Sequence, residues 1–291
     1  MTERKIRFTN YKDENYKDVC NFLIELNKKN KEHINWNWAR WEWMYYHTDF
    51  DKTLMHHIGL WWHEQTIVGA AIYDQYFGEA FCGCLSEWQE ILSEIIDYAC
   101  ENLKDDSGLG IAVNDSNKEL QKVLLEKGFH KAKQDETILK IRLEEILQYS
   151  IPKEHTIKEI NLKDDVYQYQ WVLWQGFDHG NDKKEFEDQL IYEEVKRPHF
   201  RSDLCLVVAD KNGNFIAHCN CWIAEETDYA YIEPVCTIPE YRKEGLGKAI
   251  VYEALNRCRL LGAKEAYVIS DQPFYYNLGF EKQEHYSFWW L

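Results

Sequence analysis

The stretch Thr237-Ile238-Pro239-Glu240-Tyr241-Arg242-Lys243-Glu244-Gly245-Leu246-Gly247-Lys248-Ala249 decides the fold of this chain. It predicts the end of a strand, a turn at Pro239, a basic glycine-rich loop and the start of a helix. Such a loop aims several backbone N–H groups at one point, and the helix behind it adds its positive end. Glycine at 245 and 247 lets the main chain approach a bulky anion without an intervening Cβ. The stretch therefore predicts a phosphate or pyrophosphate site, although glycines near a helix start also occur in ordinary tight turns.

The segments on both sides of this loop make the pattern more specific. Upstream, Tyr229 to Cys236 is β-branched and aromatic, as is typical of a strand. Downstream, apolar residues from Ala249 to Leu261 recur at helical spacing, and Gly262 ends the helix. A second short strand, Glu265 to Ile269, leads into Phe274-Tyr275-Tyr276-Asn277-Leu278-Gly279-Phe280.

This order of motifs resembles the GNAT family, the acyl-CoA-dependent N-acyltransferases. In that family an Arg/Gln-x-x-Gly-x-Gly/Ala loop holds the pyrophosphate of coenzyme A, and a Phe-Tyr-x-x-Leu-Gly-Phe segment follows the next strand. Both motifs stand in this chain in the right order and at the usual separation. The resemblance implies an α/β fold with a mixed, α+β type of sheet, and acetyl-CoA as co-substrate.

The chain also contains an internal repeat. Gly128-Phe129 lies 151 positions before Gly279-Phe280, and Ser86-Glu87-Trp88-Gln89 lies 153 positions before Pro239-Glu240-Tyr241-Arg242. A predicted helix follows the second pair of segments in both copies. The repeat predicts two tandem GNAT-like domains, residues 1–147 and 152–291, joined near Pro152.

The two copies differ where the chemistry is expected. The first copy has Leu92 and Glu94 in place of the two loop glycines, and Leu124 in place of Tyr275. Side chains in the loop would block a close backbone approach, and a carboxylate would repel a pyrophosphate. The N-terminal domain is therefore predicted to be degenerate, with catalysis in the C-terminal domain.

The resemblance implies two coenzyme-binding segments in the second copy. The backbone of a strand that splays from its neighbour pairs with the pantetheine arm, and the basic loop holds the pyrophosphate. These segments are Val235, Cys236 and Thr237 on the strand, and Arg242, Lys243, Glu244, Gly245, Leu246, Gly247 and Lys248 in the loop.

Two residues are the candidates for acid–base catalysis. Tyr275 occupies the position of the family's general acid, which protonates the departing thiolate, although a packing tyrosine would fit this aromatic turn as well. Glu233 is the candidate base, because the resemblance implies a glutamate on this strand that takes the proton, and strand alternation places Glu233 on one face with Tyr231, Val235 and Thr237. A solvent-facing carboxylate or a lysine partner is the alternative for Glu233. His218, on the preceding predicted strand (Phe215 to Ile223), is a weaker candidate base, since a lone strand histidine is more often structural.

In this family the first two helices and the loop between them contact the acceptor substrate. The corresponding helices are predicted at Lys163 to Phe177 and Lys184 to Lys196. The loop between them, Phe177 to Asp182, carries two carboxylates that could meet a cationic amine or could simply cap a helix.

Composition limits the remaining choices. A net charge of −16 argues against a nucleic-acid partner and favours cationic or neutral partners such as amines. Nine scattered cysteines without zinc-type spacing predict reduced, mostly buried thiols and no metal site. The charged N-terminus and the lack of a long apolar run predict a cytoplasmic protein without a membrane segment.

The sequence thus predicts an enzyme, an acetyl-CoA-dependent N-acetyltransferase acting on a primary amine of a small molecule. The N-terminal domain would shape the substrate cleft or the surface of a homodimer. The alternative is a non-catalytic acyl-CoA sensor, in which the loop binds the coenzyme without turnover. Peptidyl transfer from aminoacyl-tRNA is disfavoured by the negative charge and the intact loop.

Overall fold

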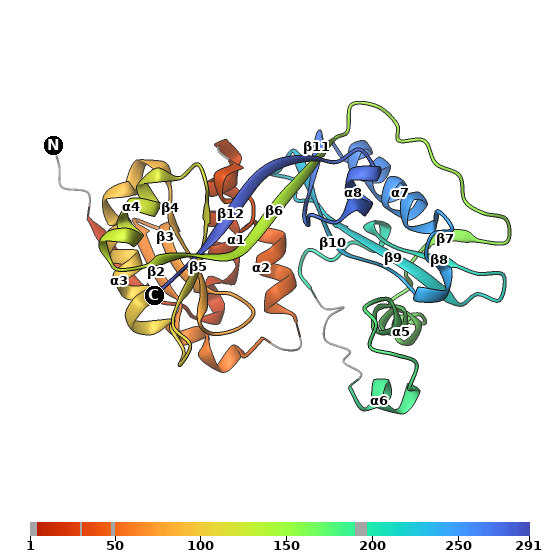
Figure 1. Ribbon diagram of the computed structural model, residues 1–291, viewed down its shortest axis with the longest axis horizontal. Helices are drawn as coiled ribbons and strands as arrows, with labels where there is room; N and C mark the ends of the chain where they lie inside the picture. The colour runs from red at the N-terminus through yellow and green to blue at the C-terminus, as the bar shows by residue number, and fades with distance from the viewer. Residues whose placement is uncertain (1–4, 30, 48–49, 190–196) are drawn as a thin grey trace. The chain divides into compact units, whose positions relative to one another are not determined.

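The computed structural model describes residues 5–29, 31–47, 50–189 and 197–291. The chain forms two compact units (Figure 1). Unit 1 comprises Met1–Ile138, Ile269–Asp271 and Lys282–Leu291, and unit 2 comprises Leu139–Val268 and Gln272–Glu281. The units therefore depart from the contiguous boundaries expected at residues 147 and 152. The reason is the C-terminal strand, which pairs antiparallel with a strand near residue 112 and so groups with unit 1.

Unit 1 is built around strands in the order β1-β2-β3-β4-β5-β12-β6. The strands are β1 (Ile6–Asn10), β2 (Gly59–His63), β3 (Thr66–Tyr73), β4 (Glu79–Cys84), β5 (Gly110–Asn114), β6 (His130–Arg142, which continues into unit 2) and β12 (Glu281–Trp290). The helices are α1 (Tyr16–Lys29), α2 (Trp38–Tyr45), α3 (Leu92–Asn102) and α4 (Lys118–Glu126). Strands β1 to β4 pair antiparallel and β4 pairs parallel with β5, so the sheet is mixed.

Unit 2 repeats this plan with strands in the order β11-β10-β9-β8-β7. The strands are β7 (Thr156–Glu159), β8 (Cys205–Ala209), β9 (Phe215–Trp222), β10 (Tyr229–Thr237) and β11 (Glu265–Ile269). The helices are α5 (Val166–Gly176), α6 (Lys183–Asp188), α7 (Leu246–Leu260) and α8 (Pro273–Asn277). Short 3-10 turns are η1 (Asp13–Asn15), η2 (Lys31–His33), η3 (Lys52–His57) and η4 (Ser86–Ile91) in unit 1, and η6 (Ser202–Leu204) and η7 (Pro239–Tyr241) in unit 2.

The core of unit 2 lies on both faces of its sheet. Strands β8 and β9 are buried along their whole length, as expected of central strands covered by helices on both sides. On one face the Cys236 thiol contacts the Val172 carbonyl oxygen of α5 at 3.5 Å. On the other face Cys221 of β9 contacts Cys258 of α7. Helices α5 and α7 therefore cover opposite faces of the sheet, and each face of β10 packs against a different helix.

Strands β10 and β11 separate before β10 ends. They pair in parallel only from Tyr229↔Glu265 to Tyr231↔Tyr267, while β10 continues to Thr237. The pairing of β10 with β9 shifts between Ile232 and Val235, because β10 carries one extra residue there. A bulge of this kind reverses the alternation of side chains along the strand beyond it.

Most predicted elements of unit 2 are present. The strand Glu265–Ile269 has the predicted bounds, and the predicted helices near 249–261 and 163–177 correspond to α7 and α5. The predicted helix Lys184 to Lys196 is only partly observed: α6 ends at Asp188, and residues 190–196 lie outside the described residues.

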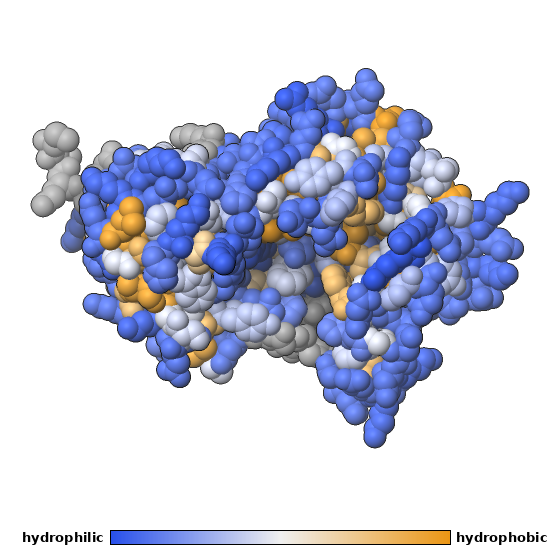
Figure 2. All heavy atoms as spheres, viewed as in Figure 1, coloured by the Kyte–Doolittle hydropathy of each residue, from blue (hydrophilic) through white to orange (hydrophobic). Residues whose placement is uncertain are grey.

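The surface and the cysteines agree with the composition. The face in Figure 2 is mostly hydrophilic, as the charge of −16 leads one to expect. All nine cysteines are free thiols, and eight are buried, which confirms the prediction of reduced, mostly buried cysteines. Within the described residues, no helix combines the length and the apolar character that crossing a membrane requires.

Candidate active site

The loop that precedes α7 presents a row of unpaired main-chain donors. Within the described chain, none of the N–H groups of residues 243–248 has a hydrogen-bond partner, and the first bond of the helix runs from Ala249 N–H to the Gly245 carbonyl (3.0 Å). No side chain caps this end of α7. Lys243 (φ +70°) and Gly245 (φ +86°) adopt left-handed conformations, which are typical of main-chain nests. The loop therefore has the main-chain geometry of an anion-binding nest, at the positive end of a long helix.

Glycine is required at the two loop positions for different structural reasons. Gly245 needs its positive φ, and a Cβ there would meet nothing within 4 Å. A Cβ on Gly247 would lie 3.2 Å from the Phe274 ring and 3.5 Å from the Thr237 hydroxyl oxygen. Gly247 therefore lets α8 pack closely against the loop, a role that the sequence did not indicate.

The Arg242 side chain is directed toward the end of α5. Its guanidinium donates to the Gly176 carbonyl (2.9 Å), to the Thr237 carbonyl (2.9 Å) and to the Asp178 carboxylate (3.0 Å). These bonds tie the loop to the C-terminus of α5. Arg242 thus supports the loop through protein contacts, whereas Lys243 and Lys248 are the loop's remaining cations beside the nest.

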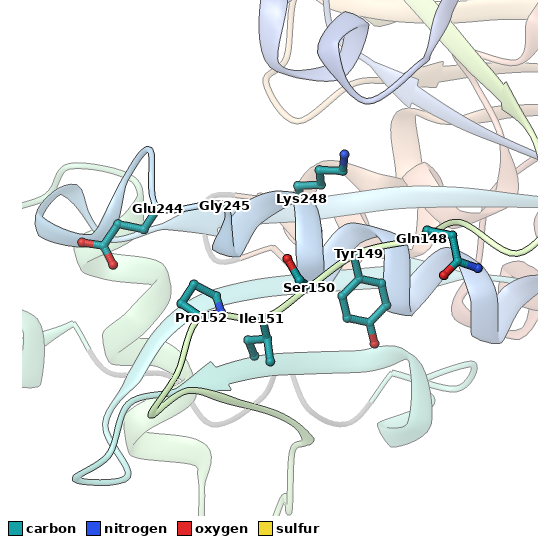
Figure 3. A pocket seen from close by; sticks show the side chains of 8 residues that line it. All are labelled: Gln148, Tyr149, Ser150, Ile151, Pro152, Glu244, Gly245 and Lys248. Carbon is teal, nitrogen blue, oxygen red and sulfur yellow. The ribbon is translucent and has the colours of Figure 1, made fainter.

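A cavity of about 400 Å³ opens beside this loop (Figure 3). Glu244, Gly245 and Lys248 line it on one side, and the connecting segment 148–152 lines it on the other. The segment is held along α7, because the Asn256 side chain bonds both main-chain groups of Leu147 (2.9 and 3.0 Å) and the Tyr149 hydroxyl donates to Glu253 (2.7 Å). Segment 148–152 as part of the site was not expected from the sequence.

The open edge of β10 lies next to the loop. The N–H of Ile238 bonds to Ile216 of β9 (3.0 Å), so alternation directs the main-chain groups of Cys236 toward β9 as well. The main-chain groups of Val235 and Thr237 therefore point away from β9, toward the space that β11 has left. Of the three predicted strand residues, Val235 and Thr237 have main-chain groups that face this edge, while the Cys236 side chain is buried against α5.

Glu233 lies within the β10 bulge. The extra residue places Glu233 and Tyr231 on the α5 face, and Val235 and Thr237 on the α7 face. The prediction that all four share a face was therefore wrong for Val235 and Thr237. A proline inside a central strand usually marks a bulge, so Pro234 was the available signal.

Three donors hold Glu233. The Tyr231 hydroxyl donates to the Glu233 carboxylate at 2.6 Å. The Trp222 indole N–H (2.7 Å) and the Asn220 amide (3.1 Å) donate to the Glu233 carbonyl oxygen. Tyr231, Trp222 and Asn220 are all buried. Sequence reasoning missed these partners, because their role depends on the bulge.

Tyr275 lies on the other side of the sheet from the α5 face. It sits on α8, its side chain is 7% exposed, and its ring contacts Phe274 and Phe280. Its hydroxyl has no hydrogen-bond partner in the part of the chain that the structure describes. Burial raises the pKa of Tyr275, and the thiol of Cys219 and the carboxylate of Glu233 add to this. Tyr275 is therefore a protonated donor close to both the loop and Glu233.

The weaker candidates have structural roles. His218 is fully buried, and its Nδ1–H donates to the Leu206 carbonyl (2.9 Å). Burial lowers the pKa of His218 to about 3, so the ring is neutral and inaccessible. In the loop after α5, Asp182 caps α6 by accepting from two N–H groups, and Asp178 pairs with Arg242. The helix-cap interpretation is thus confirmed for Asp182.

The corresponding positions of unit 1 serve its own packing. The Glu94 carboxylate accepts from the Trp61 indole N–H (2.8 Å), and Leu124 is buried. The residue before α3, Ile91, has right-handed helical dihedrals, unlike Gly245. Unit 1 therefore lacks the left-handed turn on which the anion-binding nest of unit 2 depends.

No group of three or more His, Cys, Asp or Glu side chains that could hold a metal ion occurs among the described residues. The polar groups of the site are main-chain N–H groups and two lysines as donors, a carboxylate as acceptor, and a phenol. This set suits a phosphorylated thioester and a basic nucleophile.

Comparison with known proteins relates residues 163–280 to a known family. The model of the acetyltransferase (GNAT) family matches residues 163–280, which span the loop, Glu233 and Tyr275. An uncharacterized N-acetyltransferase of Methanocaldococcus jannaschii is 26% identical over 155 residues, which is 48% of this chain and 67% of the relative.

Solved structures with the same fold cover almost the whole chain. A GCN5-related N-acetyltransferase from Sphaerobacter thermophilus matches with a TM-score of 0.62 at 11% identity, over 98% of this chain and 94% of that one. A tandem GNAT protein from the clavulanic acid biosynthesis pathway matches with a TM-score of 0.61 at 11% identity, over 98% of each chain. Residues 163–280 thus match the acetyltransferase (GNAT) family, and the fold of the whole chain is the tandem mixed α/β fold of solved GNAT proteins.

Proposed function

We propose that this protein transfers the acetyl group of acetyl-CoA to a primary amine of a small molecule, with the chemistry in unit 2. The observation that carries the proposal is the row of unpaired N–H groups at residues 243–248, which adjoins the open edge of β10. A pyrophosphate needs such donors, and a pantetheine arm needs such an edge. Lys243 and Lys248 add positive charge beside them.

The bulge in β10 separates the two halves of the proposed reaction. Tyr275 and the loop lie on the α7 side of the sheet, and Glu233 lies in the bulge on the α5 side. An amine that approaches from the α5 side meets the base, while the thioester reaches the same point from the α7 side. The net charge of −16 favours the approach of cationic amines.

Each residue then has one task. Acetyl-CoA supplies the thioester. Glu233 accepts a proton from the ammonium form of the substrate, either directly or through a water molecule, and the free amine attacks the carbonyl carbon. Tyr275 gives its proton to the sulfur as the carbon–sulfur bond breaks. The proton on Glu233 and the second proton lost by the attacking nitrogen pass to solvent. Solvent reprotonates Tyr275, and the products are an N-acetylated amine and coenzyme A.

Calorimetric titration of acetyl-CoA into the full chain tests the binding site. The informative pair of variants is Gly245→Ala and Gly213→Ala, because both glycines have φ near +85° and neither Cβ would meet an atom within 4 Å. The two substitutions should destabilise the fold equally, yet only Gly245→Ala should weaken acetyl-CoA binding, by tenfold or more. Equal affinity in both variants would place the coenzyme elsewhere.

A thiol-release assay with a panel of amines tests the reaction. The panel contains spermidine, tyramine, tryptamine, glucosamine and lysine, and mass spectrometry identifies any acetylated product. Turnover that is lost in Glu233→Gln and Tyr275→Phe supports the enzyme. Tight binding of acetyl-CoA without turnover on any amine would favour the alternative, a sensor that uses the same loop.

A further inference from the structure

Glu233 has more hydrogen-bond donors around it than a catalytic carboxylate requires. In a regular strand the Glu233 carbonyl would take part in the ladder, but the bulge removes it from that pattern. The side chains of Asn220 and Trp222, both buried, supply its hydrogen bonds instead. Two buried side chains thus fix one main-chain oxygen, and with it the position from which the carboxylate projects.

The carboxylate itself has a dedicated donor. Tyr231 is two residues before Glu233, its side chain is 2% exposed, and its hydroxyl lies 2.6 Å from Glu233 Oε2. Because the ring is packed in the sheet, the hydroxyl has a fixed direction. A hydrogen bond that is donated to the charged form of an acid stabilises that form.

From this geometry we infer that Tyr231 is a positioning residue, which orients the Glu233 carboxylate toward the amine and keeps it ionised for proton abstraction. This inference rests on the proposed function, in which Glu233 is the base. Tyr231 would not touch the substrate. Its effect would be on the direction and the proton affinity of Glu233.

Other groups face Glu233 from the neighbouring elements. Tyr275 on α8 is close enough for the carboxylate to contribute to the raised pKa of the phenol. The Arg197 guanidinium lies 5.1 Å from the ring centroid of Trp222, whose indole N–H bonds Glu233. These charges are retained when Tyr231 is changed to phenylalanine, so the substitution isolates the contribution of a single hydroxyl.

The chain offers a closely matched control. Tyr267 is the register partner of Tyr231 on β11, it is 1% exposed, and its hydroxyl donates to Glu265, two residues before it. Tyr267→Phe therefore removes an equally buried hydroxyl from an equivalent tyrosine–glutamate pair. Glu265 lies opposite Tyr229, at the paired end of β10 and β11, away from the bulge.

The test is a pH titration of Glu233 by NMR in the full-length protein. Glutamate is labelled with carbon-13 at the carboxyl carbon, and the Glu233 signal is assigned as the one lost in Glu233→Gln. Tyr231→Phe should raise the midpoint of this titration by about one pH unit, because one hydrogen bond to the ionised form is lost. Tyr267→Phe should leave it unchanged. With spermidine as the amine, the acid limb of kcat/KM should move upward by the same amount in Tyr231→Phe alone.

Each contrary result has a separate meaning. An unchanged midpoint in a folded Tyr231→Phe protein overturns the inference, as does a shifted midpoint with an unmoved acid limb. Full activity of Glu233→Gln would instead remove the base from the proposed function, and the inference with it. If Tyr231→Phe does not fold, Tyr231→3-fluorotyrosine keeps the ring and strengthens the donor. The midpoint should then fall, and an unchanged midpoint would contradict the inference.

Discussion

The protonation state of one residue, Tyr275, decides what a phenol can do in this site. Burial raises its pKa, so the group remains a proton donor throughout the neutral and moderately alkaline range. We predict that Tyr275→Phe lowers kcat by about 10²- to 10⁴-fold, the usual contribution of a positioned general acid. The affinity for acetyl-CoA should change little, since only the hydroxyl is removed. Steady-state kinetics and calorimetry measure the two quantities, and a phenylalanine variant with wild-type kcat would assign Tyr275 to packing alone.

The sign of the pH effect at Tyr275 is also fixed by its burial. A depressed pKa would make activity fall as the phenol ionises at neutral pH. A raised pKa predicts that the alkaline limb of the kcat profile does not come from Tyr275 below about pH 10, the ordinary value for tyrosine. A limb below pH 9 that disappears in Tyr275→Phe would contradict the protonated state described above.

His218 should couple stability to pH. Its pKa is about 3 in the folded protein because it is buried, compared with about 6.5 in an unfolded chain. The neutral ring thus contributes its full stability above pH 6.5 and loses it progressively as pH falls toward 3. Between pH 7 and pH 5 the loss is about 2 kcal/mol.

The variant His218→Asn removes this titration and keeps a donor for the Leu206 carbonyl. Urea unfolding of both proteins at pH 7 and pH 5 gives the difference directly. The free energy of unfolding should fall by about 2 kcal/mol more in the wild type than in the variant, since the other acids titrate in both. Parallel losses in the two proteins would show that His218 binds protons equally in both states.

At the scale of elements, Arg242 joins the glycine-rich loop to α5. Its guanidinium bonds two main-chain carbonyls as well as the exposed Asp178 carboxylate. We predict that Arg242→Met destabilises the protein by about 1–3 kcal/mol, because carbonyl groups lose their donors. Asp178→Asn should cost less than about 1 kcal/mol, as exposed ion pairs do. Urea titrations measure both values, and equal costs would mean that the ion pair alone matters.

The same loop explains which elements a sequence can predict. Gly245 and Gly262 flank α7, and their positive φ angles are local requirements that leave a local signal. The residues of β11 likewise carry their own strand pattern, and its bounds were predicted correctly. The face of Glu233 was not predictable by counting alternate residues, because one extra residue in β10 shifts the register. Tyr231 and Trp222 were missed for the same reason.

At the scale of the whole molecule, the pairing of β12 with β5 is the feature furthest from any local signal. Tyr286 pairs with Asn114 and Trp290 pairs with Gly110. Partners so distant in the chain produce no recognisable sequence pattern in either segment. The repeat correctly indicated a tandem GNAT fold. It could not indicate that the C-terminal strand completes the unit that contains the N-terminus.

This pairing predicts that residues 1–147 do not fold as an isolated fragment. Without β12 the fragment loses the buried side chains of Tyr286, Phe288 and Trp289 and leaves the edge of β5 unpaired. Each buried aromatic side chain stabilises by about 1.5–3 kcal/mol, so the loss approaches the whole stability of a typical domain, about 5–15 kcal/mol. A second fragment, with residues 278–291 appended through a flexible linker, should recover a cooperative thermal transition in near-ultraviolet circular dichroism. Cooperative unfolding of residues 1–147 alone would show that β12 is dispensable, and in that case Phe288→Ala in the full chain should cost far less than the about 3–5 kcal/mol expected of a core phenylalanine.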